Sequence, residues 1–201
     1  MSGRNVELIE KITAFKGYFR IDRYKLRHEL FAGGMSGIMM RELFERGHAV
    51  GLLPYDPDRD QVVLIEQFRI GAYAIGWDPW LLEVVAGIIE EGEKLDEVAR
   101  REGKEETGLV VSELEPIAHY LVSPGGTTET CALYCGRVDA SKAEGFHGVA
   151  AEHEDIRVMA LPAEEAIALL EKGRIANAAA VIALQWLALN RATLRKKWLR
   201  G

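Results

Sequence analysis

Apolar and polar residues alternate in several short runs before residue 161, which is the pattern of half-buried strands. Strands are expected at 12–27, 38–46, 49–55, 61–69, 81–86, 117–122, 130–138 and 155–161, with a further strand region starting at 110–114. Clusters of glycine, proline and aspartate separate these runs and predict turns or loops. Residues 71–80 are expected to form an irregular loop, and residues 1–10 an arm or a frayed end.

Three other stretches predict helices. Lys94–Thr107 is composed of good helix formers, and Gly108 directly after it suits a helix C-cap. A second helix is expected from Pro162 to about Gly173, since proline is favoured in the first helical turn. A third is expected over 177–191. Strands through the middle of the chain, with one helix among them and two after them, predict an α+β fold with a mixed sheet between helices.

The composition is that of a folded chain, and it argues against several classes of protein. The chain has 201 residues, 48% of them hydrophobic, and a formal net charge of −6. Nucleic-acid binders held by phosphate contacts are normally basic, so no nucleic-acid partner is expected. The sequence contains no signal peptide and no long apolar span, and its two cysteines lie too far apart along one expected strand for an easy disulfide. A cytoplasmic protein without a membrane partner is therefore predicted.

The most informative feature is the acidic side of the helix expected at Lys94–Thr107. Glu102, Glu105 and Glu106 are spaced i, i+3 and i+4, so they share one side of the helix. Like charges placed in this way repel one another unless water dilutes the repulsion or a cation neutralises it. The stretch is thus either a solvated acidic face or a site for a hard divalent ion such as Mg²⁺, which also recruits substrate phosphates.

The longer stretch from Gly87 to Leu109 resembles the Nudix box, G-x5-E-x7-R-E-U-x-E-E-x-G-U, in which U is a bulky apolar residue. The matching positions are Gly87, Glu93, Arg101, Glu102, Glu105, Glu106, Gly108 and Leu109. Gly103 departs from the pattern, and glycine inside a helix costs about 1 kcal/mol relative to alanine. The resemblance implies a Nudix-type α/β/α sandwich at 48–201, preceded by an N-terminal strand-rich extension at 1–47.

The resemblance also implies a metal centre of two or three Mg²⁺ ions, with Mn²⁺ as the alternative. Glu102 and Glu106, one helical turn apart, are the expected side-chain ligands, together with the backbone carbonyl of Ala86. Glu93 and Arg101 are expected to pair with each other and to hold the preceding loop on the helix, which is a structural role.

Hydrolysis of a diphosphate also requires a base for the attacking water. The connection 148–156 contains Glu152, His153 and Glu154, a group that taken alone also fits a solvated loop. It resembles the mobile loop that delivers a catalytic glutamate in the ADP-ribose pyrophosphatase branch of the family. By this resemblance Glu152 is the base and Glu154 a further metal contact, while the reverse assignment and a role for His153 stay open.

A second mark of that branch is a loop in which Pro124 follows Gly108 by sixteen residues. Its proline and glycines alone predict only a hairpin turn. The resemblance implies that the following residues bind substrate: Tyr18, Phe19, Arg41, Arg46, Arg69, Ile88, Ser123, Pro124, Gly125 and Glu129. An aromatic side chain near residue 18 is expected to stack on adenine, Glu129 to contact the terminal ribose, and the arginines to face the diphosphate or the base.

The resemblance extends from Phe15 to Trp198 and implies a metal-dependent enzyme that cuts ADP-ribose to AMP and ribose 5-phosphate. One alternative is a pyrophosphatase for GDP-mannose or another nucleotide sugar, and another is a non-catalytic regulator that binds a nucleotide. The resemblance further implies a homodimer formed through the N-terminal strands, often by strand exchange. The N-terminal sequence itself predicts only strands that need a partner sheet.

Overall fold

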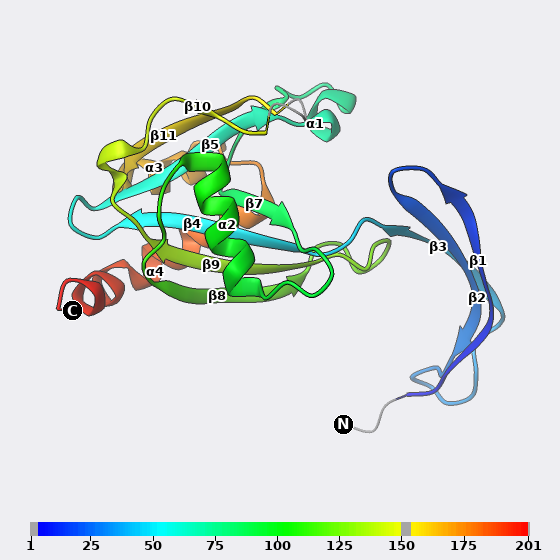
Figure 1. The fold of residues 1–201 in the computed structure, drawn as a ribbon. Coiled ribbons are helices and arrows are strands. Elements are labelled where there is room, and N and C mark those ends of the chain that lie inside the picture. Colours follow the sequence, from blue (N-terminus) through cyan, green and yellow to red (C-terminus); the bar gives the residue numbers. More distant parts are fainter. Residues whose placement is uncertain (1–3, 150–153, 201) are drawn as a thin grey trace. The chain divides into compact units, whose positions relative to one another are not determined.

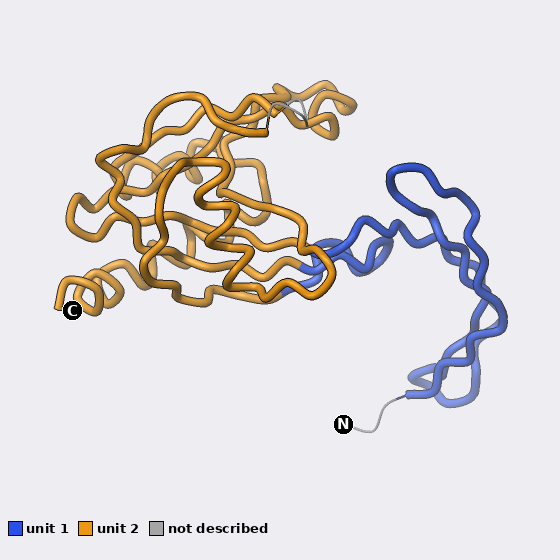
Figure 2. Tube along the Cα trace, in the orientation of Figure 1, with its two compact units in different colours: residues 1–48, 120–130 blue, residues 49–119, 131–201 orange. Residues whose placement is uncertain are grey.

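The structure, a computed structural model, describes residues 4–149 and 154–200. Contacts between Cα atoms divide the chain into two compact units (Figure 2). Unit 1 comprises residues 1–48 and 120–130, and unit 2 comprises residues 49–119 and 131–201. The segment 120–130 thus groups with the N-terminal strands, although it lies far from them in sequence. The domain boundary expected at residue 47 stays a prediction.

Unit 1 contains an antiparallel three-stranded sheet in the order β1-β2-β3. Its strands are β1 (Val6–Lys16), β2 (Arg20–His28) and β3 (Met39–Glu45). The expectation of a frayed end or arm over residues 1–10 is wrong from Val6 onward, because β1 pairs with β2 along its whole length. Every side chain of β1 is nevertheless exposed, so backbone pairing rather than burial orders this strand.

Unit 2 is built on an eight-stranded sheet. Its strands are β4 (Ala49–Asp56), β5 (Gln61–Phe68), β6 (Trp80–Glu83), β7 (Val85–Ile88), β8 (Leu114–Leu121), β9 (Thr130–Arg137), β10 (Phe146–His147) and β11 (Ile156–Pro162). The main order is β10-β11-β5-β4-β9-β8, with β6 beside β5 and β7 beside β4. Because β4 runs parallel to β9 and antiparallel to β5, the sheet is mixed, which confirms the sequence-based expectation.

Helices cover both faces of this sheet. They are α1 (Ile70–Ala74), α2 (Leu95–Thr107), α3 (Ala163–Glu171) and α4 (Ala178–Trp198), with a short 3-10 helix at Ala140–Lys142. In Figure 1, α2 crosses the front of the sheet, and α3 and α4 lie behind it. The α+β architecture expected from the sequence is therefore confirmed. No helix in residues 4–149 or 154–200 is long and apolar enough to cross a membrane.

Two helix predictions require correction. Residues 71–74, expected as loop, belong to α1, a single turn too short to show a periodic pattern. The last helix continues to Trp198 instead of stopping near residue 191. Trp198 is 1% exposed and its ring lies 6.3 Å from that of Tyr55, so this buried contact holds the last turns of α4 despite their basic sequence.

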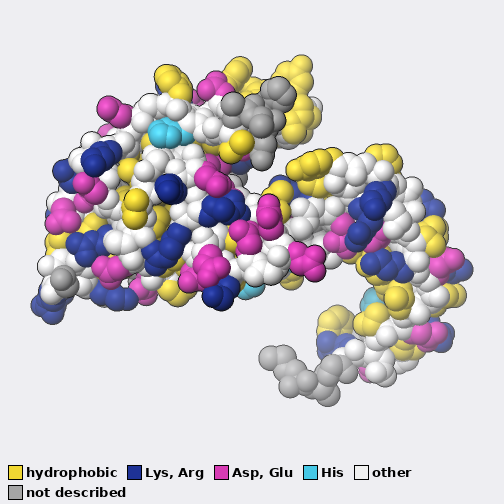
Figure 3. Space-filling view, in the orientation of Figure 1, with side chains coloured by type: hydrophobic (Ala, Val, Ile, Leu, Met, Phe, Trp, Pro, Cys, Tyr) yellow, Lys and Arg dark blue, Asp and Glu magenta, His cyan; other side chains and the backbone are white. Residues whose placement is uncertain are grey.

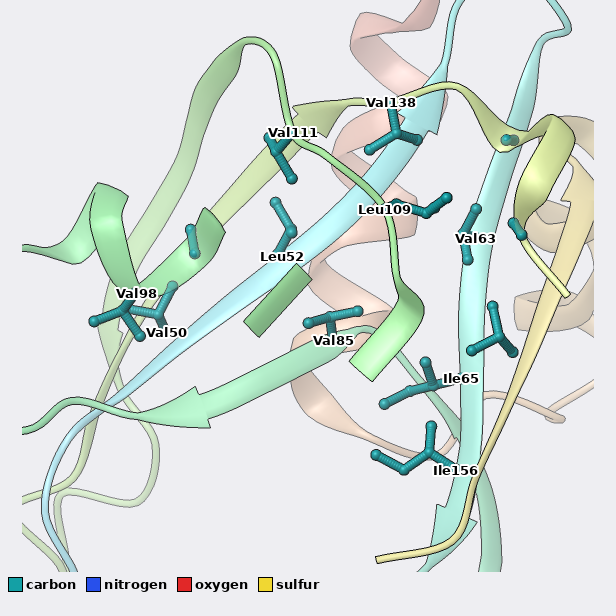
Figure 4. Packing of buried hydrophobic residues seen from close by; sticks show 14 of the residues in the cluster. Val50, Leu52, Val63, Ile65, Val85, Val98, Leu109, Val111, Val138 and Ile156 are labelled. Atoms are coloured by element: carbon teal, nitrogen blue, oxygen red, sulfur yellow. The ribbon is translucent and has the colours of Figure 1, made fainter. Parts of the chain in front are cut away.

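One hydrophobic cluster of the core lies between α2 and the sheet (Figure 4). Valine and leucine side chains from β4, β5 and β7 meet Val98 and Ala99 of α2 there. Seven of the eight residues of β4 are buried in an unbroken run, because this strand is covered on both faces. Apolar and polar residues do not alternate in this run. The two faces of β4 are therefore distinguished only by the elements that pack on each of them.

Gly103 lies at the closest approach of α2 to the sheet, and this explains its departure from the box pattern. A Cβ atom on Gly103 would lie 2.9 Å from Leu52 Cδ2 and 3.0 Å from Val111 Cγ2. Leu52 also packs closely on Gly136, since a Cβ there would lie 2.7 Å from Leu52 Cδ1. The missing side chains of Gly103 and Gly136 therefore allow Leu52 to pack closely against both positions.

Replacing Gly103 by alanine is expected to lower the free energy of unfolding by about 1 kcal/mol. The gain of about 1 kcal/mol in helix propensity is outweighed by overpacking against Leu52 and Val111, which costs about 1–3 kcal/mol. Urea denaturation would measure the change, with Lys104→Ala on the exposed side of α2 as a control that stays within about 0.5 kcal/mol of the parent. A Gly103→Ala protein more stable than the parent would contradict this account.

Candidate active site

Helix α2 begins and ends as the sequence predicts. Lys94 has an extended backbone at the N-cap, and Asp96 and Glu97 lie in the first turn, where negative charge is favourable. Gly108 ends the helix in the left-handed conformation, with φ of 70°, and its N–H donates to the carbonyl of Lys104 at 2.9 Å. This well-defined end sets the position of the last helical turn, which carries the acidic side chains.

The three glutamates of α2 have different surroundings. Glu106 is 4% exposed, whereas the side chain of Glu105 is 44% exposed. Glu102 lies between these extremes and rests directly on the backbone of β7, because Gly87 has no side chain. A Cβ on Gly87 would lie only 1.7 Å from Glu102 Oε1 and 1.9 Å from its Cδ. Gly87 is therefore required for the observed position of the Glu102 carboxylate.

Arg101 holds the loop before α2 against the helix. Its Nε and Nη2 donate to the two carboxylate oxygens of Glu93, each at 3.1 Å. Its Nη1 donates to Glu102 at 2.7 Å and to Glu105 at 3.1 Å. The hydrogen bonds from Arg101, followed by one from the N–H of Glu90, lower the pKa of Glu93. The expected pairing of Glu93 with Arg101 is confirmed, and Arg101 also orients Glu102.

Glu106 is a buried carboxylate with little compensation for its charge. Burial raises its pKa to about 8, although the N–H of Ala86 donates to its Oε2 at 3.2 Å and opposes the shift. The negative charges of Glu102 and Glu154 raise the pKa further, and the positive charge of Arg69 lowers it. Glu102, Glu106 and Glu154 therefore influence one another electrostatically, and their assignment as metal ligands stays a prediction.

Glu154 reaches this group from the segment that precedes β11. Its Oε2 accepts a hydrogen bond from the N–H of Val149 at 3.2 Å. Gly148 has φ of 108°, and a Cβ there would lie 2.8 Å from the Cβ of Glu154. Glycine is therefore required at position 148 for this close approach to Glu154. Glu152, the expected base, and His153 lie outside the described residues.

The chemistry of these donors fits a hard divalent cation. A buried carboxylate is stable as an anion only when a positive charge compensates it, and the neighbours of Glu106 include two further carboxylates. Within 4–149 and 154–200, however, no three acidic, histidine or cysteine side chains already converge as metal ligands. Glu102 faces Arg101 and Glu154 accepts from Val149, so both would have to turn toward a bound ion.

Arg69 and Ile88 flank the acidic group. The Nε and Nη2 of Arg69 donate to Oε2 of Glu83 at 3.0 and 2.7 Å, and Glu83 is 2% exposed. Ile88 ends β7 with a partly exposed side chain, and its carbonyl lies 3.5 Å from Nη2 of Arg101. The sequence reasoning did not identify Glu83. The sequence feature that could have indicated Glu83 is that it is the single carboxylate in the otherwise apolar stretch 81–85.

Several other expected substrate-binding residues lie in unit 1. Arg46 donates to Glu129 at 3.3 Å, and its guanidinium group lies 5.7 Å from the ring centroid of Phe19. Tyr18 is 90% exposed and packs edge-on against Phe19, with centroids 4.8 Å apart. The fold therefore brings four of the expected residues together, namely Tyr18, Phe19, Arg46 and Glu129. Arg41 lies outside this group, where it donates to the carbonyl of Met40.

The loop expected near Pro124 is a tight turn. The carbonyl of Ser123 accepts from the N–H groups of Gly126 and Thr127, each at 3.0 Å. Ser123, Pro124 and Gly125 are all exposed. Thr127 pairs with Phe44 in an isolated bridge, and the N–H of Phe44 donates to Gly126. These contacts explain why the turn belongs to unit 1, with the strands that carry Phe19 and Arg46.

Comparison with known protein families shows the family to which the acidic helix belongs. Residues 45–198 match the NUDIX domain. The chain belongs to the Nudix family. The expectation drawn from the stretch Gly87–Leu109 is thereby confirmed. Nudix hydrolases generally use divalent metal ions, which agrees with the chemistry of the donors around Glu106.

Similar proteins span nearly the whole of this Nudix chain. The ADP-ribose pyrophosphatase of Escherichia coli strain K12 is 54% identical over 197 residues, which cover 98% of the chain and 94% of that protein. The ADP-ribose pyrophosphatase of Haemophilus influenzae is 44% identical over 203 residues, covering 100% and 94%. The GDP-mannose pyrophosphatase of Pectobacterium atrosepticum is 33% identical over 181 residues, covering 90% and 92%.

The fold has a counterpart among solved structures. A crystal structure of an ADP compounds hydrolase superposes with a TM-score of 0.69 at 21% identity, covering 94% of this chain and 97% of the other. At this identity the likeness concerns the fold alone. It supports the arrangement of a mixed sheet between helices in this Nudix chain.

Proposed function

We propose that this chain hydrolyses the diphosphate of ADP-ribose to AMP and ribose 5-phosphate. The observation that carries the proposal is its 54% identity, over nearly its whole length, to an ADP-ribose pyrophosphatase. Identity to a GDP-mannose pyrophosphatase is lower, at 33%. The box acids are complete, and the buried Glu106 gives them a chemical role that a solvated acidic face would not have.

The metal centre is proposed to contain two or three Mg²⁺ ions, with Mn²⁺ as an alternative. The residues that would hold them are Glu102, Glu106, Glu154 and the carbonyl of Ala86. When bound, such ions neutralise phosphate charge and lower the pKa of a water molecule. The N–H of Ala86 holds Glu106 on β7, whereas Arg101 holds Glu102 in a position from which its carboxylate would turn toward a bound ion.

The remaining expected residues are proposed to act on the proton and on the substrate. Glu152 is proposed as the base that takes the proton of the attacking water, on the basis of its place in the sequence two residues before Glu154. Phe19 or Tyr18 would stack on adenine and Glu129 would contact the terminal ribose. Ile88 and the turn at Ser123, Pro124 and Gly125 would complete the substrate contacts. Arg41, Arg46 and Arg69 would face the diphosphate or the base.

A homodimer is also proposed, formed through unit 1. It is supported by four apolar side chains of β1, namely Val6, Leu8, Ile12 and Phe15, which are 67%, 54%, 43% and 62% exposed. Apolar residues at this density on an exposed strand favour association with a partner. Sedimentation velocity would test the dimer against the 22.4 kDa mass of one chain.

No nucleic-acid partner is proposed. The net charge of −6 is unfavourable for binding a phosphate backbone. In Figure 3, basic and acidic side chains are interspersed on the side of the molecule in view. A cytoplasmic location is proposed on the basis of composition, since two buried cysteines in a chain of this length fit a reducing compartment.

The substrate is tested by measuring product release from a panel of nucleoside diphosphate compounds, with and without Mg²⁺. AMP release from ADP-ribose is expected to be the fastest reaction and to require the metal. Faster GMP release from GDP-mannose would favour a pyrophosphatase for another nucleotide sugar. It would overturn ADP-ribose as the substrate but not diphosphate hydrolysis as the reaction. Tight nucleotide binding without Mg²⁺-dependent turnover would favour a non-catalytic regulator and overturn the enzyme proposal.

Replacing Glu152 by glutamine is expected to lower kcat by about a hundredfold or more while leaving KM nearly unchanged, because a general base acts only in the transition state. Glu154→Gln is the matched variant. It is expected to raise the Mg²⁺ concentration needed for half-maximal activity. Steady-state kinetics over a Mg²⁺ titration separates the two effects. If Glu154→Gln lowers kcat at saturating Mg²⁺ far more than Glu152→Gln does, the two roles are reversed.

A further inference from the structure

A carboxylate outside the Nudix box is buried beside the acidic group. Glu83 ends β6, and only 2% of its surface is exposed. Its two oxygen atoms bind different partners: Oε2 accepts from Arg69, and Oε1 accepts from Nδ2 of Asn177 at 3.0 Å. Because a buried carboxylate needs charge and hydrogen-bond compensation, these three residues form one unit.

The geometry of this unit restricts how Arg69 can bind. Both Nε, at 3.0 Å, and Nη2, at 2.7 Å, donate to the same oxygen of Glu83. The other oxygen is occupied by Asn177, so the two-oxygen fork that arginine commonly forms with a carboxylate is not used. Among the described residues, Nη1 of Arg69 makes no hydrogen bond. The guanidinium is therefore fixed along one edge and retains donors on the other.

Asn177 is itself held in place by helix α4. It is the N-cap residue of that helix, and its Oδ1 accepts from the N–H of Ala180 at 3.2 Å. With its oxygen bound to the helix, its amide nitrogen is directed to Glu83. A rigid element on the far face of the sheet thus determines where the carboxylate of Glu83 lies, and through it the orientation of Arg69.

Arg69 is anchored near the proposed metal site. Its side chain is 42% exposed, and its partner Glu83 lies three residues before Ala86, whose N–H donates to Glu106. Arg69 is thus anchored along one edge of its guanidinium group and open along the other. This arrangement, near the carboxylates of the proposed metal site, suits Arg69 to bind a phosphate group. The anchor matters because an untethered guanidinium in this position would be free to pair with Glu106 itself.

We propose that Glu83 and Asn177 are positioning residues, which hold Arg69 with its Nη1 edge directed at the substrate diphosphate. This inference rests on the proposed diphosphate hydrolysis. Glu83 and Asn177 do not touch substrate. They keep Arg69 in one orientation and away from the acids that would bind metal, so they contribute to substrate binding only through Arg69.

A double-mutant cycle separates this role from a purely structural one. Steady-state kinetics with ADP-ribose and Mg²⁺ is measured for the parent, Arg69→Ala, Glu83→Gln and the double variant. Arg69→Ala is expected to lower kcat/KM about a hundredfold, mainly by raising KM. Glu83→Gln alone is expected to lower it about tenfold. Glu83→Gln in the Arg69→Ala background is expected to add less than about a twofold further loss, because its only path to the substrate is gone.

The matched control is Glu115→Gln. Glu115 on β8 binds Nζ of Lys197 at 2.5 Å and so ties the end of α4 to the sheet, as Glu83 ties its beginning. Its loss is expected to change kcat/KM less than about twofold. A tenfold loss with Glu83→Gln that persists undiminished in the Arg69→Ala background would overturn the proposal, since it would show a general effect on the fold.

A second variant and an NMR measurement test the same contacts even if Glu83→Gln fails to fold. Asn177→Ser retains a capping oxygen for α4 but removes the donor to Glu83, and it is expected to lower kcat/KM about threefold, again only when Arg69 is present. By NMR, the Nε–H of Arg69 should exchange slowly in the parent and rapidly in Glu83→Gln. Rapid exchange of the Arg69 Nε–H in the parent would show that Glu83 does not hold Arg69 in place. A parent protein that hydrolyses no diphosphate would instead refute the proposed function, whatever the exchange rate.

Discussion

Replacing Glu106 by glutamine is expected to lower kcat by about a thousandfold or more while the fold persists. A metal ion stabilises transition-state charge by several kcal/mol, and each 1.36 kcal/mol corresponds to about a tenfold change in rate. The glutamine retains an oxygen for the Ala86 N–H but cannot offer an anionic ligand. Because burial already disfavours the charged form of Glu106 and raises its pKa to about 8, the neutral glutamine should leave the metal-free protein at least as stable as the parent.

Thermal unfolding with and without Mg²⁺ tests the two parts of this prediction separately. Mg²⁺ should raise the melting temperature of the parent, since a ligand that binds only the folded state stabilises it. The same addition should have little effect on Glu106→Gln. Glu105→Gln is the control, because that side chain is 44% exposed on the same helix and pairs with Arg101. Near-normal turnover of Glu106→Gln in Mg²⁺ would refute the metal assignment.

Replacing Gly87 by alanine is expected to lower kcat/KM by about a hundredfold, although it adds only a methyl group. The new Cβ would lie 1.7 Å from Glu102 Oε1 and 2.6 Å from its Cγ, so the carboxylate must leave its place on β7. Glu102 is at the edge of the core, where its side chain is 12% exposed, and the displaced carboxylate can move into solvent. Activity is therefore expected to fall much more than the melting temperature.

Two comparisons show whether the loss acts through Glu102. Gly37→Ala is the control, because a Cβ there meets nothing within 4 Å and the backbone is not in the left-handed region. It should have nearly the activity of the parent. In a Glu102→Ala background, Gly87→Ala should cause no further loss, since the displaced group is already absent. A Gly87→Ala enzyme as active as the parent would mean that Glu102 acts from another position.

Local sequence was sufficient for much of the candidate site. Helix α2, its end at Gly108, and the pairing of Glu93 with Arg101 all depend on residues close together in the chain. The spacing of the acids on α2 follows from helix geometry alone. The strands were recognised for the same reason, with errors at their ends and at β1, where pairing with β2 rather than periodicity decides the structure.

Other features depended on contacts between distant residues, which no local pattern reports. The need for Gly103 arises from Leu52 and Val111, and the burial that raises the pKa of Glu106 arises from β7. The anchor of Arg69 joins Glu83 to Asn177, 94 positions later in the chain. Sequence by itself indicated the candidate residues and determined the helix that displays the acids, because those depend on residue type and spacing. Tertiary structure alone decided which carboxylates are buried and what holds the arginine beside them, because burial and hydrogen-bond partners exist only once strands and helices pack together.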